Sequence, residues 1–285
     1  MKEVMKTNNS SRSQAIWNTL RLSGLLALLG AWTALADPSF SWDTMRPEQN
    51  AETKEVALTQ TATFSASDFG SGNGVALNQI NLASVASYFG LDASVDYSLV
   101  SVVVSVTLVS ETGPEWTFLN TSHADGVDVT ITSWDQSYSL PVTLSQGESS
   151  GLTTTASGST SASSLNIPAG DLENGAFFLE QGVPKTYNST LIASAGTSSI
   201  ADNEGSIGLD AFLSDGSGTG GVSVNAGQLT ATGNTQGPPG VTVSVDPNLS
   251  LRVTITYNLV PEPTSFALLM TGAAFLLRRR RRLVK

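Results

Sequence analysis

The sequence contains no cysteine, a single histidine and few charged residues. With no cysteine among its 285 residues, the chain can form no disulfide, no thiolate nucleophile and no cysteine-ligated metal site. Charged residues make up only 13% of the chain, which argues against a helical bundle with Glu and Lys on its solvent faces. A chain without disulfides relies on its core, and a domain of roughly 200 residues buries enough surface for that.

Basic residues are scarce in the middle of the chain. Residues 37–260 contain four basic residues against 22 Asp and Glu, for a net charge of −18. The four are Arg46, Lys54, Lys185 and Arg252. Such an acidic segment repels nucleic acid phosphates and anionic lipid headgroups. We therefore expect no nucleic acid partner.

The N-terminus has the three parts of a secretory signal. A basic stretch ends at Arg21, and residues 22–35 are apolar apart from small Ser, Gly and Thr. Ala34 and Ala36 place small residues at the two positions that a signal peptidase reads, so residues 1–36 are predicted to be removed and Asp37 to begin the mature protein. A buried amphipathic helix is the alternative, and the absence of a polar face counts against it.

The C-terminus also has three parts, over residues 261–285. Pro261, Glu262 and Pro263 precede an uncharged apolar run at 266–277. A cluster of arginines follows, comprising Arg278, Arg279, Arg280, Arg281 and Arg282. The apolar run would extend about 18 Å as a helix, and a start nearer Pro263 with snorkelling arginines brings it closer to a membrane span. We predict a transmembrane helix with the arginines on the cytoplasmic side.

This tail resembles the PEP-CTERM sorting signal of Gram-negative bacteria. The resemblance implies export, an intermediate anchored in the inner membrane, cleavage near the Pro-Glu-Pro motif by an exosortase and transfer to the cell surface or extracellular space. The family's association with exopolysaccharide-producing bacteria implies a role in biofilm or envelope matrix, with exopolysaccharide as a candidate partner. A plain C-terminal anchor is the alternative.

The residues between the two ends predict an all-β fold. Residues 37–54 are expected to form a polar linker, and 55–260 an antiparallel β-sandwich of about ten short strands. Residues 97–109 are β-branched almost throughout and apolar on both faces, which is typical of a central strand. Residues 251–257 alternate strictly, as a strand with one wetted face does. This last strand is expected to pair with an early one, and one or two helical turns are expected near 83–89.

A Ser/Thr/Gly tract at 145–164 has almost no apolar residues, and we expect it to be a long mobile loop.

The layout of the middle also resembles the choice-of-anchor E type of extracellular domain. The resemblance depends on the Val-rich strand 97–109, Asp210-Ala211-Phe212, Gly220-Gly221 and a closing strand that runs into the tail. It implies a β-sandwich and no known activity.

No motif for catalysis stands out, and we expect a protein that is not an enzyme. A secreted hydrolase would require His123 to meet a serine and a carboxylate, or two carboxylates to converge in a cleft. No catalytic or metal-binding residue is predicted, although calcium could bind the acidic turns at Asp125–Asp128 and Asp202–Glu204. A carbohydrate-binding or adhesive module is a further alternative, which would require Trp116, Trp134 and Tyr138 to form an exposed stacking platform.

Overall fold

The computed structural model describes residues 37–43, 48–50, 53–91, 95–130, 134–147, 149–201, 207–214, 221–235 and 237–262. The chain divides into two compact units, Met1–Asp37 and Pro38–Lys285, and the strands belong to the second. The predicted signal peptide and the tail from Pro263 onward, with its apolar run and arginines, lie outside the described residues.

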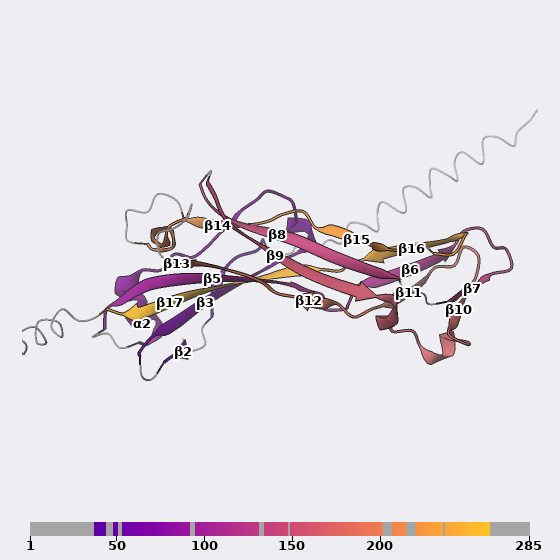
Figure 1. Ribbon diagram of the computed structural model, residues 1–285, viewed down its shortest axis with the longest axis horizontal. Coiled ribbons are helices and arrows are strands. Elements are labelled where there is room, and N and C mark those ends of the chain that lie inside the picture. The colour runs from indigo at the N-terminus through magenta and orange to yellow at the C-terminus, as the bar shows by residue number, and fades with distance from the viewer. Residues whose placement is uncertain are drawn as a thin grey trace, which may run out of the picture. The chain divides into compact units, whose positions relative to one another are not determined.

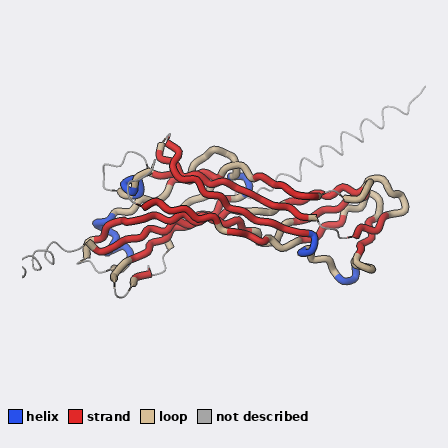
Figure 2. The backbone as a smooth tube through the Cα atoms, viewed as in Figure 1, coloured by secondary structure: helices blue, strands red, loops and turns tan. Residues whose placement is uncertain are grey.

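Across the described residues, seventeen strands build two large sheets and two small ones, more strands than the ten predicted and in part longer (Figures 1 and 2). The first large sheet has the order β1-β3-β17-β5-β13, with β2 beside β3, and every strand pairing is antiparallel. Its strands are β1 (Ser41–Trp42), β2 (Glu48–Gln49), β3 (Val56–Phe64), β5 (Tyr97–Val109), β13 (Gly196–Ala201) and β17 (Ser250–Pro261). The last strand of the chain thus lies between two early ones, as predicted.

The second large sheet has the order β12-β9-β8-β14-β4, with β15 also paired to β8. Its strands are β4 (Val75–Ala76), β8 (Asp135–Gln146), β9 (Ser149–Ser161), β12 (Ile192–Ser194), β14 (Val222–Ala226) and β15 (Thr230–Asn234). At one edge, β12 pairs with β9 and the very next strand, β13, pairs with β5. The chain therefore crosses directly from one sheet to the other there.

The main core lies between the two large sheets. Alternate residues of β17 are fully buried, and one hydrophobic cluster joins them to inward residues of both sheets, such as Val104 on β5 and Val142 on β8. This arrangement confirms the predicted antiparallel, sandwich-like β fold. The predicted helical turn is α2 (Leu82–Phe89), which begins at Asn81, whose side chain accepts from the N–H of Ala83, and ends at Gly90, where φ is 70°.

Short 3-10 turns complete the described elements. They are η1 (Ala66–Asp68), η2 (Ala162–Ser164), η3 (Ala169–Asp171) and η4 (Leu209–Phe212). In η4, Leu209, Ala211 and Phe212 are buried, so this turn adds apolar side chains to the main core.

A second, smaller core is rich in aromatic residues. It is enclosed by β11-β6-β16 and by β10-β7, whose bounds are β6 (Glu115–Asn120), β7 (Val127–Thr130), β10 (Ala176–Leu179), β11 (Lys185–Asn188) and β16 (Val241–Asp246). Phe118 packs within 5.0 Å of Phe177 and 5.3 Å of Trp134, measured between ring centroids. The predicted single sandwich thus contains a second packing centre.

The prediction of a mobile loop at 145–164 is wrong. This tract forms β9, which pairs with β8 along almost its whole length, and then η2. Its inward positions are small: Ala156 and Thr160 are buried, and a Cβ built at Gly158 would lie 3.1 Å from Leu191. Small side chains allow the facing sheet to approach, so this strand is buried without large apolar residues.

The prediction of a polar linker at 37–54 is wrong in part. Here β1 and β2 extend the first sheet by pairing with β3, and Phe40 is buried in the main core. The ring of Trp42 packs 5.5 Å from Phe89 and 5.4 Å from Tyr257. Two aromatic residues two positions apart are enough to hold this segment on the sheet edge.

Candidate functional site

The candidate site is the end of β17, where the folded domain meets the tail. Pro261 pairs with Tyr97 and Val260 pairs with Ser98, both on β5. One residue further, the backbone N–H of Glu262 donates to the carbonyl of Asp96 over 2.8 Å. The hydroxyl of Ser98 donates to a carboxylate oxygen of Glu262 over 2.7 Å. The first two residues of the Pro-Glu-Pro motif are therefore part of the sheet, and Pro263 lies outside the described residues.

A proline fits at this position of the strand because its missing N–H is not needed there. The bond from Glu262 to Asp96 makes these two a hydrogen-bonded pair, and antiparallel pairing alternates, so the nitrogen of Pro261 points away from β5. On the other side of β17, the last pair with β3 joins Leu259 to Val56, so β3 does not reach Pro261. Proline is tolerated in a strand where no ladder bond is lost.

A bulge in β5 disturbs the ladder close to the motif. The register shifts between Asn258 and Leu259, which pair with Ser101 and Leu99, so Val100 is left out of the pairing. Val100 is 38% exposed, and the side chain of Asn258 donates to the Ser101 hydroxyl over 2.8 Å. An extra residue in one strand bends it and increases the local twist.

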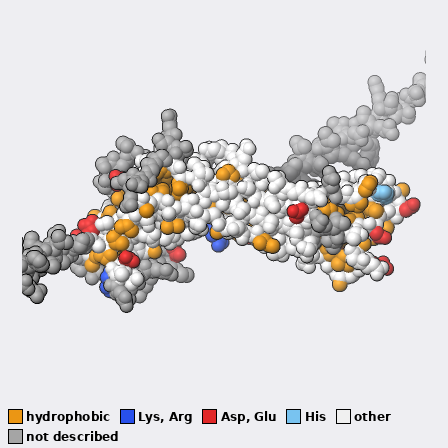
Figure 3. All heavy atoms as spheres, viewed as in Figure 1, with side chains coloured by type: hydrophobic (Ala, Val, Ile, Leu, Met, Phe, Trp, Pro, Cys, Tyr) orange, Lys and Arg blue, Asp and Glu red, His pale blue; other side chains and the backbone are white. Residues whose placement is uncertain are grey.

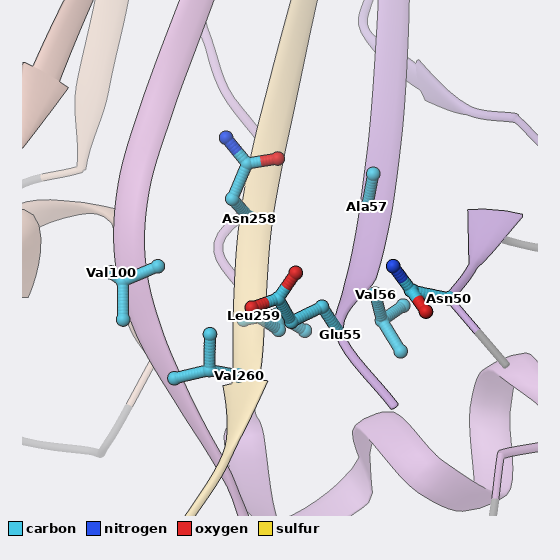
Figure 4. Close-up of a pocket in the computed structure, with 8 residues that line it drawn as sticks. All are labelled: Asn50, Glu55, Val56, Ala57, Val100, Asn258, Leu259 and Val260. Atoms are coloured by element: carbon cyan, nitrogen blue, oxygen red, sulfur yellow. The ribbon is translucent and has the colours of Figure 1, made fainter. Parts of the chain in front are cut away.

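A groove of about 640 Å³ lies at this bulge, and Figure 4 shows the residues that line it. Its described lining comes from β3, β5, β17 and the segment between β2 and β3: Asn50, Glu55, Val56, Ala57, Val100, Asn258, Leu259 and Val260. These residues offer one carboxylate, two amides and the exposed or partly exposed apolar side chains of Ala57, Val100 and Val260, whereas Val56 and Leu259 are buried. Such a surface can bind an extended peptide or a partner's side chains through hydrogen bonds and apolar contacts.

Behind the end of β17, a buried polar network fixes the strand. The amide of Gln60, which is fully buried, donates to the hydroxyl of Tyr257 and to the carbonyl of Asn78 over 3.1 Å, and accepts from the N–H of Asn78 over 3.2 Å. Burial raises the pKa of Tyr257 well above its ordinary value, and the bond with Gln60 offsets this in part. The tyrosine therefore stays neutral and anchors β17 to β3.

His123 lies apart from this site, and its ring is bound to the backbone of a different loop. Its Nε2 is 2.7 Å from the carbonyl oxygen of Pro239 and therefore donates to it. The backbone N–H of His123 donates to Asn120 over 2.9 Å, which ties the histidine into the turn after β6. Because its Nε2 is engaged by a backbone carbonyl, the histidine has the role of a turn residue.

The exposed aromatic platform that a carbohydrate-stacking module would require is not formed. Trp116 is 0% exposed, and Trp134 and Tyr138 are each 2% exposed. The two tryptophans belong to the small aromatic core, and Tyr138 belongs to the main core. None of the three rings can stack on a sugar, because each packs against other side chains inside the domain.

The acidic turns considered for calcium are placed as follows. Asp125 and Asp128 are exposed near the start of β7, and the turn at 202–204 lies outside the described residues. Within the described ranges, no group of three or more His, Asp or Glu is close enough to hold a metal ion.

Of the sorting and processing residues that the sequence singled out, Asp37, Pro261 and Glu262 are described. Ala34, Ala36, Pro263 and Arg278–Arg282 lie outside the described residues. In the part of the chain that the structure covers, no helix has both the length and the apolar character needed to span a membrane. The contacts from Asp96 and Ser98 to Glu262 could not be found from sequence, because they depend on the register between strands far apart in the chain.

No curated protein matches the sequence. One matching structure is that of the infectious bursal disease virus Gx strain, at 12% identity, covering 86% of this chain and 49% of that one. The chain thus spans about half the length of that protein, and the TM-score of 0.10 carries no argument about fold or function.

A comparison with protein families identifies the tail. Residues 259–282 match the PEP-CTERM protein-sorting motif. The match begins at Leu259, so it includes the end of β17 as well as Pro261 and Glu262. It does not extend into the rest of the domain, and the choice-of-anchor E resemblance stays an expectation. The chain carries a PEP-CTERM sorting motif joined directly to its last strand, and this motif supports an exported protein that passes through a membrane-anchored intermediate and is sorted by an exosortase.

Proposed function

We propose that this protein is a non-enzymatic component of the cell surface or extracellular matrix, delivered by a signal peptidase and an exosortase. The observation that carries the proposal is the sorting motif at 259–282, which follows the sandwich without an intervening linker. A tail of this kind serves to deliver the domain before it, so the delivered part is the domain up to the motif.

The composition of the domain supports a role in a hydrated matrix. The segment from 37 to 260 carries a net charge of −18, and Figure 3 shows a face on which charged side chains are few and the backbone and uncharged side chains predominate. The outward positions of β9 include the exposed Thr153, Thr155 and Ser157. Such a surface stays soluble and exchanges hydrogen bonds with water or with hydroxyl-rich polysaccharide, so exopolysaccharide is the partner we propose.

The site geometry supports a role without catalysis. Among the described residues, the groove at the bulge is lined by a single carboxylate, Glu55, and His123 is engaged by Pro239. Glycoside hydrolysis needs two carboxylates flanking one bond. The buried positions of Trp116, Trp134 and Tyr138 remove the observation on which the carbohydrate-stacking alternative depended.

The test is the intact mass of the protein from its native host, measured in the inner membrane, outer membrane and released fractions. We expect the outer or released form to lack residues 1–36 and the tail with Arg278–Arg282. A matched strain replaces those five arginines by glutamine, and its protein should accumulate with the tail still attached. If the wild-type protein retains the arginines and stays in the inner membrane, it is a simple anchored domain and the proposal is wrong.

A further inference from the structure

We propose that Asn73 is a site of spontaneous covalent modification, at which the folded domain converts an asparagine into aspartate and isoaspartate. The chain contains two Asn-Gly pairs, Asn73-Gly74 and Asn174-Gly175. A glycine after asparagine favours this reaction, because no Cβ shields the backbone nitrogen that attacks the side chain. The fold lets the first pair react and holds the second pair in a conformation that opposes the reaction.

The reaction is intramolecular and neither oxidises nor reduces the chain. The backbone nitrogen of Gly74 bonds to the Cγ carbon of Asn73, and the side-chain amide leaves as ammonia with the proton that this nitrogen gives up. Water then adds to one of the two carbonyl carbons of the five-membered ring and breaks its bond to the ring nitrogen. Attack at Cγ gives aspartate, and attack at the main-chain carbon gives isoaspartate, whose backbone is one methylene longer.

Asn73 lies in an exposed stretch between η1 and β4. Ser71, Gly72, Asn73 and Gly74 are all exposed and belong to no helix or strand. The backbone N–H of Asn73 donates to the Ser71 hydroxyl over 3.2 Å, but in the described part of the chain no hydrogen bond holds its side chain or the N–H of Gly74. The backbone of Asn73 is also outside the left-handed region. The nitrogen of Gly74 can therefore approach the side chain of Asn73 without the loss of a strand pair.

Asn174 is exposed too, but its backbone conformation keeps the reacting atoms apart. Asn174 and Gly175 form a tight turn with φ of 52° and 80°, closed by two hydrogen bonds between Glu173 and Ala176 over 2.8 and 3.0 Å. In the left-handed conformation ψ is about +47°, which places the nitrogen of Gly175 on the far side of the Cα–C bond from the Asn174 side chain. The turn must open before it reacts, and loss of two such hydrogen bonds lowers the open population by about tenfold.

The modification affects β4, which begins two residues after Asn73. Val75 and Ala76 pair with Val224 and Ser223 of β14. A Cβ built at Gly74 would lie 2.9 Å from the Oγ of Ser223, so Gly74 already packs closely against β14. The extra methylene of isoaspartate displaces the residues that lead into β4, and we expect β4 to pair less firmly with β14 in that form.

The experiment follows both asparagines in one sample. The protein is purified from its native host and incubated at neutral pH, and mass spectrometry after chromatographic separation measures asparagine, aspartate and isoaspartate at each position. In the folded protein we expect Asn73 to convert at least about tenfold faster than Asn174. In urea the turn is lost and both sites should convert at similar rates. Equal rates in the folded protein, or the same ratio in the unfolded chain, would overturn the proposal.

Hydrogen exchange tests the effect on β4. The backbone N–H of Leu77 donates to the carbonyl of Val222 over 2.9 Å, directly beside the β4 pairs. Its exchange should be faster in the aged wild-type protein than in equally aged Asn73→Gln, whose longer side chain closes the ring far more slowly. Freshly purified Asn73→Asp is the matched control, because it adds the same negative charge on a backbone of normal length. If aged wild type and Asn73→Asp exchange equally at Leu77, the backbone effect on β4 is wrong.

Discussion

The domain should not fold without its last strand. The test compares two recombinant chains that differ only at the C-terminus, residues 37–262 and residues 37–249. The shorter chain lacks β17, which is the strand between β3 and β5 in the first sheet. Without it, β3 and β5 lose their shared neighbour, and the inner face of the second sheet loses part of its packing surface.

The expected loss can be worked out from the buried side chains. β17 contributes Leu251, Val253, Ile255, Tyr257 and Leu259, all 0% exposed. Burying each such side chain stabilises a protein by about 1.5–3 kcal/mol, so the five together contribute roughly 8–15 kcal/mol. Whole domains unfold with only about 5–15 kcal/mol. Deletion of the strand therefore removes as much free energy as the domain has.

The assay is urea unfolding followed by circular dichroism and tryptophan fluorescence. The chain 37–262 should show a cooperative transition, and the chain 37–249 should show none. Two point variants of the longer chain calibrate the estimate: Ile255→Ala should lower the free energy of unfolding by about 2–5 kcal/mol, and Thr254→Ala, on the other face of β17, by less than about 1 kcal/mol. A cooperative transition of similar midpoint in the chain 37–249 would refute the reasoning.

Two further predictions concern the small aromatic core. Ser189→Ala should lower the free energy of unfolding by about 3 kcal/mol in urea titrations. The buried hydroxyl of Ser189 accepts from Trp116 over 3.1 Å and from Thr160 over 2.6 Å, and both donors would lose their partner. The control is Ser194→Ala at an exposed position, and equal losses in the two variants would contradict this role. Burial, and then the charge of Asp171, raises the pKa of Tyr187 to about 12. The folded state therefore holds the phenol proton more tightly than the unfolded chain does. The resulting stabilisation is complete below pH 10 and is lost as pH rises toward 12. Unfolding midpoints measured between pH 9 and pH 11 should fall less steeply for Tyr187→Phe than for wild type, and identical slopes would show that Tyr187 does not titrate in this way.

The strands with large side chains can be predicted from the sequence. The Val-rich segment 97–109 predicts a central strand, and β5 indeed has a partner on each side. The alternation at 251–257 predicts the buried face of β17 correctly, with Leu251, Val253 and Ile255 inward. In both cases the pattern is a direct consequence of strand geometry, because successive side chains point to opposite faces.

Burial of small residues cannot be predicted in the same way. The composition of β9 predicts a loop because its inward residues are Ala, Gly and Thr, which contribute little to any hydrophobic pattern. Its burial depends on the opposing sheet, where Leu108 supplies the bulk that Gly158 lacks, with 3.6 Å between the Leu108 side chain and a Cβ built at Gly158. A single sequence does not show which strand will face which, so this complementarity is not visible in it.

The surroundings of the aromatic residues escape prediction for a related reason. Trp116 and Phe118 are two residues apart on β6, which fixes that they share a face but not whether that face is buried. The second core that encloses them depends on β7, β10 and β11, which are only four residues long, too short for a clear alternation of apolar and polar residues. The hydrogen bond from Ser98 to Glu262 is equally hidden, since it joins residues 164 positions apart.

The position of the sorting motif makes processing compatible with this fold. The bond that joins Gln60 to Tyr257 links residues 197 positions apart, so the first sheet closes only when β17 is present beside β3. In a chain that is exported from its N-terminus, residues 250–261 emerge after all the other described strands. Cleavage upstream of Pro261 would release a chain that lacks part of its central strand, whereas cleavage after Glu262 releases one in which every described strand is complete. A motif placed one strand earlier would separate the domain from the strand that holds it together, whereas here the motif begins at the end of β17 and leaves the buried residues Leu251 to Tyr257 outside it.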